Sequence, residues 1–212
     1  MIRSENSMAE ITLPHRQAVS SPVWKASMSR IVIPVGASLL VALCAHASIP
    51  LLFTPVPLSL APFAVLFLGL VLGPRTAFAS LSLYLLEGAI GLPVFSPQGP
   101  GGLIQLLGPT GGYLLCYPFA AALAGFIYRA APRTFTRGMV AAGAASLLIL
   151  GSGATWLKVL THVDFRLVLV QAIDPFLPGD ILKVVAASAA ATGFGAIQRR
   201  KKGKDFSKDE AL

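Results

Sequence analysis

Charged residues are scarce in this sequence, and acidic ones are scarcer than basic ones. Only 12% of the 212 residues are Asp, Glu, Lys or Arg, compared with about 25% in soluble domains. Hydrophobic residues make up 55% of the chain, and its mean hydropathy is +0.73. This composition excludes an ordinary soluble domain and predicts an integral membrane protein.

Motifs for disulfide, metal and nucleotide chemistry are also missing. The two cysteines, Cys44 and Cys116, are far apart in the chain, and no His or Cys residues have the spacing of metal ligands. The only Gly-Lys pair, at residues 203–204, is followed by Asp205 and lacks the other residues of a phosphate-binding loop. We therefore expect no metal, no cofactor and no ATP hydrolysis in this chain.

Six apolar runs are long enough to suggest membrane helices. They cover residues 31–48, 60–72, 76–90, 111–128, 139–157 and 181–197. A span needs roughly 17 to 25 residues, so the second and third runs are short. A single helix over residues 60–90 would be longer than the bilayer is thick, and Gly73-Pro74 would break it. The pattern predicts an all-α protein with six transmembrane helices and a tight turn at Gly73-Pro74-Arg75.

The positions of the basic residues support this topology. Six spans place all of the 17 Lys and Arg residues except Lys158, Arg166 and Lys183 on one side, which the positive-inside rule makes cytoplasmic. Both termini are then cytoplasmic. The expected organisation is a polar segment over 1–30, a membrane domain over 31–198 and a basic tail over 199–212. Contact with anionic membrane lipid explains the net charge of +8 without a nucleic-acid partner.

Two loops on the predicted outer side are rich in proline and glycine. Residues 49–62 and 91–112 cannot form continuous helices, yet both remain largely apolar. Backbone outside a helix is tolerated at membrane depth only if it is buried in protein or lines a cavity. The loops therefore predict a cap over a ligand pocket, with ordinary outer connectors as the alternative.

One acid and one base stand together where the last apolar run begins. Asp180 and Lys183 are i,i+3 neighbours on one helix face, just below the outer surface. They suit a small solute with an anionic end and a neutral hydrogen-bonding end, and Phe53, Phe95 and Tyr113 could cover its apolar middle. The alternative is structural, with Asp180 capping the helix and Lys183 extending to the membrane surface.

Four motifs resemble those of the BioY family, the biotin-binding S components of energy-coupling factor transporters. They lie, in matching order, at residues 49–57, 91–95, 108–113 and 175–183. The resemblance implies a six-helix fold with an outward-facing biotin site, no enzymatic activity and a location in the bacterial cytoplasmic (inner) membrane. It also implies that Asp180 and Lys183 contact the ligand.

The resemblance implies further contacts and partners. Other ligand contacts are expected from the connection between the third and fourth spans, and the candidates are Gln98, Gln105, Thr110 and Tyr113. Family members dock through their first helix on a transmembrane coupling protein that carries two cytoplasmic ATPases. In this chain the small-residue pair Ser38 and Ala42 is the candidate for that contact, although such pairs usually pack within one chain.

Other functions remain open at this point. The chain could bind another small vitamin, or it could be a stand-alone secondary carrier, although we find no inverted repeat. An intramembrane aspartyl protease would need a second carboxylate near Asp180, with Asp174 and Glu87 as candidates, and Lys183 argues against it. Glu87 could instead be a structural partner of Lys158 or Lys183, or a proton or ligand site.

Overall fold

The computed structural model of the chain describes residues 23–209, apart from residues 53 and 163. Over these residues the chain forms eight helices and two very short strands. The long helices are α1 (Val23–His46), α2 (Ala61–Leu72), α3 (Pro74–Ala89), α5 (Gly111–Arg129), α6 (Phe135–Thr161) and α8 (Leu177–Asp209). The short elements are β1 (Ser48–Ile49), β2 (Leu58–Ser59), α4 (Gly102–Leu107) and α7 (Phe165–Ala172).

The six long helices coincide with the six apolar runs of the sequence. Three of them, α5, α6 and the stretch Leu177–Arg200 of α8, are long and apolar enough to cross a membrane. The apolar helices Ile31–His46 and α2 are shorter. The chain is therefore a mostly helical, multi-pass membrane protein. Helix α1 starts before residue 31 and α8 continues beyond residue 198, so both helices extend past the predicted limits of the membrane domain.

A turn of one residue separates α2 from α3. Helix α2 ends at Leu72 and α3 begins at Pro74, and Gly73 between them has a φ of +78°, which glycine adopts without strain. The guanidinium of Arg129, at the end of α5, donates hydrogen bonds to the carbonyl oxygens of Val71 and Leu72. These carbonyls belong to the last turn of α2, where no helical partner is available. The predicted break at Gly73-Pro74 is confirmed.

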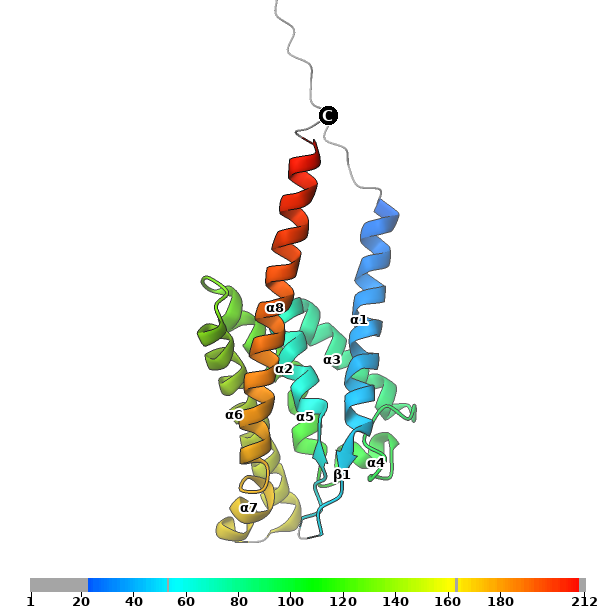
Figure 1. Cartoon of the computed structure of the whole chain (residues 1–212). Helices are drawn as coiled ribbons and strands as arrows, with labels where there is room; N and C mark the ends of the chain where they lie inside the picture. Colours follow the sequence, from blue (N-terminus) through cyan, green and yellow to red (C-terminus); the bar gives the residue numbers. More distant parts are fainter. Residues whose placement is uncertain (1–22, 53, 163, 210–212) are drawn as a thin grey trace, which may run out of the picture.

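The two Pro/Gly-rich loops are irregular, as predicted. In the first loop, β1 pairs antiparallel with β2, with Ser48 opposite Ser59 and Ile49 opposite Leu58. The second loop contains the short helix α4. The strands and α7 lie at one end of the molecule, whereas the start of α1 and the end of α8 project from the other end (Figure 1).

Helix α5 is the centre of the bundle, where it contacts α2, α3 and α6. Its crossing with α2 depends on two glycines. A Cβ on Gly69 would lie 2.5 Å from the carbonyl oxygen of Ala121, and a Cβ on Gly125 would lie 2.7 Å from the carbonyl oxygen of Gly69. Both contacts are with backbone atoms, which cannot move aside as a flexible side chain can. Helices α2 and α5 are therefore closer together than a larger residue at either glycine would permit.

We predict that Gly69→Ala and Gly125→Ala each destabilise the protein by about 1–3 kcal/mol, because the new methyl group forces the two backbones apart. Thermal unfolding of purified protein in detergent measures this effect. Gly143→Ala in α6 is the matched control, since a Cβ there meets nothing within 4 Å. Equal midpoints for all three variants would contradict the close crossing.

Candidate binding site

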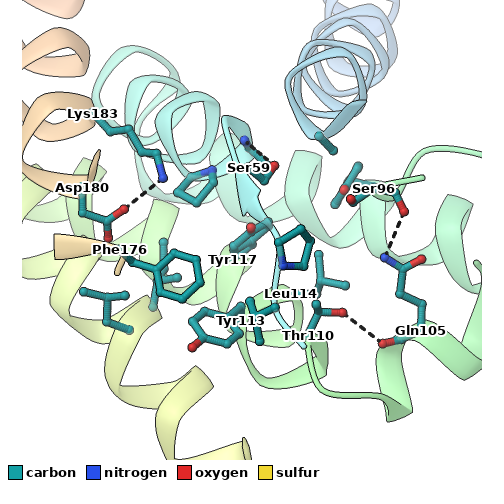
Figure 2. A pocket seen from close by; sticks show the side chains of 18 residues that line it. Ser59, Ser96, Gln105, Thr110, Tyr113, Leu114, Tyr117, Phe176, Asp180 and Lys183 are labelled. Atoms are coloured by element: carbon teal, nitrogen blue, oxygen red, sulfur yellow. Dashed lines mark hydrogen bonds and ion pairs between the residues drawn. The ribbon is translucent and has the colours of Figure 1, made fainter. Parts of the chain in front are cut away.

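A cavity opens at the end of the bundle that carries the β1–β2 pair. It contains about 600 Å³ of empty space, a figure that includes open solvent at its mouth. Its wall is mostly apolar, with Val56 and Pro57 from the first loop, Leu114 from α5, Ile149 from α6 and Phe176 from the turn before α8. Leu114 and Phe176 are labelled in Figure 2.

The most polar part of the wall is the first turn of α8. Asp180 and Lys183 both line the cavity, and the Nζ atom of Lys183 lies 3.0 Å from Oδ1 of Asp180. The two residues are 6% and 8% exposed. The predicted i,i+3 pair is thus present, but Lys183 is buried and turned toward Asp180 rather than extended to a membrane surface. This geometry favours the ligand-site interpretation over the structural alternative.

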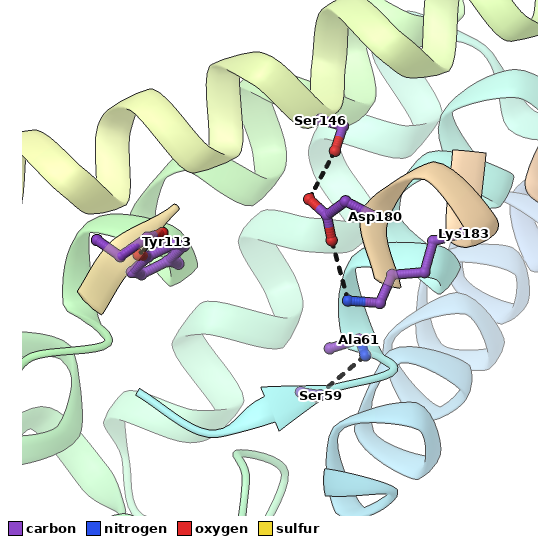
Figure 3. Close-up of polar contacts among 7 residues, drawn as sticks. Ser59, Ala61, Tyr113, Ser146, Asp180 and Lys183 are labelled. Carbon is purple, nitrogen blue, oxygen red and sulfur yellow. Dashed lines mark hydrogen bonds and ion pairs between the residues drawn. The ribbon is translucent and has the colours of Figure 1, made fainter. Parts of the chain in front are cut away.

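A serine on α6 completes the surroundings of the carboxylate. The Oγ atom of Ser146 donates a hydrogen bond of 2.8 Å to Oδ2 of Asp180, so each carboxylate oxygen has a donor (Figure 3). Because a buried carboxylate is costly unless its hydrogen bonds are made, the bond from Ser146 offsets part of that cost and holds Asp180 in one orientation. Sequence reasoning missed Ser146, whose only signal was a hydroxyl inside an apolar run.

The ion pair retains capacity for a ligand. A lysine ammonium has three N–H groups, and Asp180 is the one hydrogen-bond partner of Lys183 among the described residues. A carboxylate can accept about four hydrogen bonds, and two of these are used. The pair can therefore offer donors and acceptors side by side, with no net charge of its own.

Gln105, Thr110 and Ser96 form a second polar group in the cavity wall, contributed by the second loop. The side chain of Gln105 accepts from the N–H of Gly101 at 3.1 Å and donates to the carbonyl oxygen of Ser96 at 3.3 Å. The hydroxyl of Thr110 donates to the carbonyl oxygen of Gln105 at 3.4 Å. Gln105 and Thr110, both predicted as ligand contacts, line the cavity, but their hydrogen bonds also hold the loop together.

Tyr113 presents its ring to the cavity. Its centroid lies 6.2 Å from that of Phe176, and its hydroxyl donates a 2.9 Å hydrogen bond to the carbonyl oxygen of Ala172 at the end of α7. A Cβ on Gly153 of α6 would lie 2.2 Å from the ring, so a larger residue there would displace it. Tyr113 therefore contributes an apolar face whose position is fixed from both sides.

Gln98, another predicted contact, is not among the described residues that line the cavity. Gln98 lies beside the cavity, where its side-chain oxygen accepts from the hydroxyls of Ser48 and Ser96 and its Nε2 donates to the carbonyl oxygen of Ser48. It joins the second loop to β1, and its contact with a ligand stays a prediction. Phe53 lies outside the described residues.

Tyr84 on α3 is a cavity residue that the sequence did not reveal. It is 0% exposed and lines the cavity, with its ring at 5.4 Å and 74° from that of Phe95. Its hydroxyl has no hydrogen-bond partner among the residues that the structure describes. An unsatisfied buried hydroxyl costs about 1–3 kcal/mol, so the wall contains a polar atom that a ligand can satisfy.

The structure places the remaining candidates away from the cavity. Ser38 and Ala42 are only 2% and 6% exposed, so this small-residue pair is packed inside the chain and offers no surface to a partner. Ser38 donates a 3.1 Å hydrogen bond to Oε1 of Glu87 on α3. Glu87 is therefore a structural partner, as one interpretation predicted, but the residue it binds is Ser38. Lys183 forms its ion pair with Asp180 and not with Glu87.

Comparison with known proteins gives one consistent family. A model of the BioY family matches residues 16–200. The chain is 37% identical over 141 residues to a protein of Pyrococcus horikoshii described as a probable biotin transporter BioY, covering 66% of this chain and 82% of that protein. It is 38% identical over 178 residues to the biotin transporter BioY of Rhodobacter capsulatus, covering 77% and 92%.

A solved structure shares the fold. The chain superposes with a TM-score of 0.73 on the crystal structure of the S-component for biotin from an ECF-type ABC transporter. The match covers 81% of this chain and 93% of that one, at 23% sequence identity. At this identity the likeness concerns the fold alone.

We predict that Ser146→Ala lowers the stability of the protein by about 1–3 kcal/mol, because one oxygen of a buried carboxylate loses its donor. Thermal unfolding in detergent measures the change. Ser80→Ala is the matched control, since Ser80 is also buried but donates only to the carbonyl oxygen of Thr76 in its own helix. A loss as large in the control as in Ser146→Ala would show that Asp180 does not depend on Ser146.

Proposed function

Since the chain belongs to the BioY family, we propose that it is the biotin-binding S component of an energy-coupling factor transporter. It captures biotin in the cavity at the end that carries the β1–β2 pair. The observation that carries this proposal is the buried pair of Asp180 and Lys183 in an otherwise apolar wall. The family is a transporter component and not an enzyme.

The chemistry of the pair matches one end of biotin. The ureido ring of biotin has two N–H donors and one carbonyl acceptor, so it needs acceptors and donors side by side. Asp180 supplies the acceptors and Lys183 the donors. The carboxylate of biotin would instead bring a second negative charge beside Asp180, at a cost. We therefore place the ureido ring against the ion pair and the carboxylate toward the mouth.

The rest of the wall matches the apolar part of biotin. The sulfur-containing ring and the alkyl chain have no hydrogen-bonding capacity to satisfy, and they fit a wall built from aromatic and aliphatic side chains. These are chiefly Val56, Pro57, Tyr113, Leu114, Ile149 and Phe176. The unpartnered hydroxyl of Tyr84 is available to a polar atom of the ligand.

We propose that all six long helices cross the membrane and that both termini are cytoplasmic. The distribution of Lys and Arg supports this orientation, and so does the position of the start of α1 and the end of α8 at the same end of the molecule (Figure 1). The cavity then opens on the outer side of a bacterial cytoplasmic membrane. Helix α2 has 12 residues and spans only about 18 Å, which suffices because α1, α5 and α8 pack around it.

Transport requires partners in this proposal. The sequence contains no phosphate-binding loop, so the energy must come from a membrane coupling protein with two cytoplasmic ATPases. Concentrative uptake by vesicles that contain only this chain, driven by an ion gradient, would favour a secondary carrier instead. A protease is not supported, because neither Asp174 nor Glu87 lines the cavity with Asp180.

We predict that the purified chain binds biotin at 1:1, and that Asp180→Asn and Lys183→Met each weaken binding about ten- to a hundredfold. The reason is the loss of a charge-assisted hydrogen bond, worth about 1.5–3 kcal/mol. Isothermal titration on folded variants measures the affinity. Arg166→Gln is the control for loss of a charge, since Arg166 is exposed on α7 and does not line the cavity.

Biotin methyl ester tests the orientation in the same experiment. If the pair holds the ureido ring, both variants lose as much affinity for the ester as for biotin. If Lys183 instead holds the carboxylate, Lys183→Met has little effect on ester binding. A wild-type protein that binds another vitamin and not biotin would overturn the assignment of biotin.

We predict that Tyr84→Phe weakens biotin binding about two- to tenfold, because a hydrogen bond worth about 0.5–1.5 kcal/mol is lost. The unliganded variant should be as stable as the wild type or more stable, since a buried hydroxyl without a partner is removed. Tyr128→Phe is the matched control, because Tyr128 is equally buried but does not line this cavity. Unchanged affinity together with lower stability would show that Tyr84 is only structural.

A further inference from the structure

A second hollow lies at the opposite end of the bundle. It is lined by Leu70 and Val71 at the end of α2, Tyr128 near the end of α5, Arg133 in the α5–α6 connection, and the stretch of α8 from Ala191 to Arg199. Its empty space is about 940 Å³, including open solvent. The biotin cavity shares no residue with it, so it is a separate feature of the molecule.

The hollow lies at a membrane surface. The candidate spans Gly111–Arg129 and Leu177–Arg200 both end beside it, and the third candidate span begins just after it, at Phe135. Three chain segments that can cross a bilayer therefore have their ends here. Its lining is at the depth where lipid headgroups meet the hydrocarbon core, whichever side of the membrane it faces.

Among the described residues, the hollow has two positive charges and no negative one. Arg133 and Arg199 line it, and no described acidic residue does. The sequence contains no Asp or Glu between Glu87 and Asp164 or between Asp180 and Asp205, so no acid lies near these arginines along the chain. A hollow of this charge is complementary to an anion.

Two neighbouring arginines have a different role. Arg129 donates to the carbonyl oxygens of Val71 and Leu72, and Nε of Arg137 donates to the carbonyl oxygen of Ile127 at 2.8 Å. These two side chains hold helix ends together. Arg133 has no hydrogen bond or ion pair among the described residues, and Arg199 has only a 3.3 Å bond from Nε to the carbonyl oxygen of Gly195 in its own helix.

The remainder of the lining is mostly apolar, apart from the side chain of Gln198 and the hydroxyl of Tyr128. Its accessible apolar side chains are the half-buried Val71 and Phe194, which is 42% exposed, whereas Leu70 and Ala191 line it from buried positions. An inorganic anion would leave these apolar side chains unused, whereas a phospholipid has a phosphate for the arginines and an acyl chain for the apolar side chains. A guanidinium can also bind phosphate through two parallel hydrogen bonds.

We propose that this hollow, which we name the Arg133–Arg199 groove, binds one anionic phospholipid. The phosphate lies between Arg133 and Arg199, and an acyl chain lies along Val71 and Phe194. The lipid thereby joins the ends of α2, α5 and α8. This proposal does not depend on which solute the other cavity binds.

Phosphatidylglycerol and phosphatidylcholine distinguish a specific site from general attraction to a charged surface. The protein is purified in a mild detergent, each lipid is titrated, and native mass spectrometry counts the bound copies. We expect the wild-type protein to retain one phosphatidylglycerol. Arg133→Gln and Arg199→Gln should each weaken the affinity for this lipid about fivefold, and the double variant should weaken it about twentyfold or more. Thermal unfolding confirms that the variants are folded.

Arg75→Gln is the matched control, because Arg75 is an exposed arginine in the first turn of α3 that does not line the groove. Its affinity for phosphatidylglycerol should stay at the wild-type value. An equal loss in this control would mean that only general surface charge attracts the lipid, and equal retention of phosphatidylcholine would mean that the arginines are not used; either result overturns the proposal. Inorganic phosphate is the competitor, and displacement of the lipid by millimolar phosphate would overturn the acyl-chain contact.

Discussion

The burial of one ion pair in an apolar wall is the constraint on which the rest of this structure depends. Two charges removed from water are costly unless they are paired and their remaining hydrogen bonds are made. Asp180 and Lys183 satisfy this condition only because α8 begins at Leu177, which places them on one face of its first helical turns, and because Ser146 of α6 donates to the second carboxylate oxygen. The pair therefore fixes the start of α8 against α6, and it retains hydrogen-bonding capacity for a ligand in the cavity.

The close packing of α2 against α5 is the second constraint on the bundle, beside this polar contact. Gly69 and Gly125 let α2 and α5 cross with backbone atoms in contact, and Arg129 joins the ends of the same two helices. This part of the molecule has little space to fill. The cavity lies at the end of the bundle with the β1–β2 pair, where the wall includes loops as well as helices. The tightly packed helices beside the cavity therefore hold its walls in place, as a preformed binding site requires.

Most of the helices could be predicted from the sequence, because an apolar run in a membrane protein has few alternatives to helix. The break at Gly73-Pro74 and the pairing of Asp180 with Lys183 follow from local rules as well. The contact between Ser146 and Asp180 joins two helices and depends on how they are rotated, which no local pattern specifies. The same limit applies to Ser38, whose small side chain suggested an external partner but binds Glu87 within the chain.

The backbone hydrogen bonds of the loops over the cavity are satisfied differently from those of the helices. Their irregular backbone is satisfied by a two-residue strand pair and by side chains, chiefly Gln105 within the second loop and Gln98 between that loop and β1. The contacts of Gln98 are exposed to solvent, and such bonds are worth about 0.5–1.5 kcal/mol each. Breaking the buried ion pair would cost about 3–5 kcal/mol by comparison. The loop contacts are therefore weaker than the ion pair, so we expect the loops rather than the pair to move if a ligand enters the cavity.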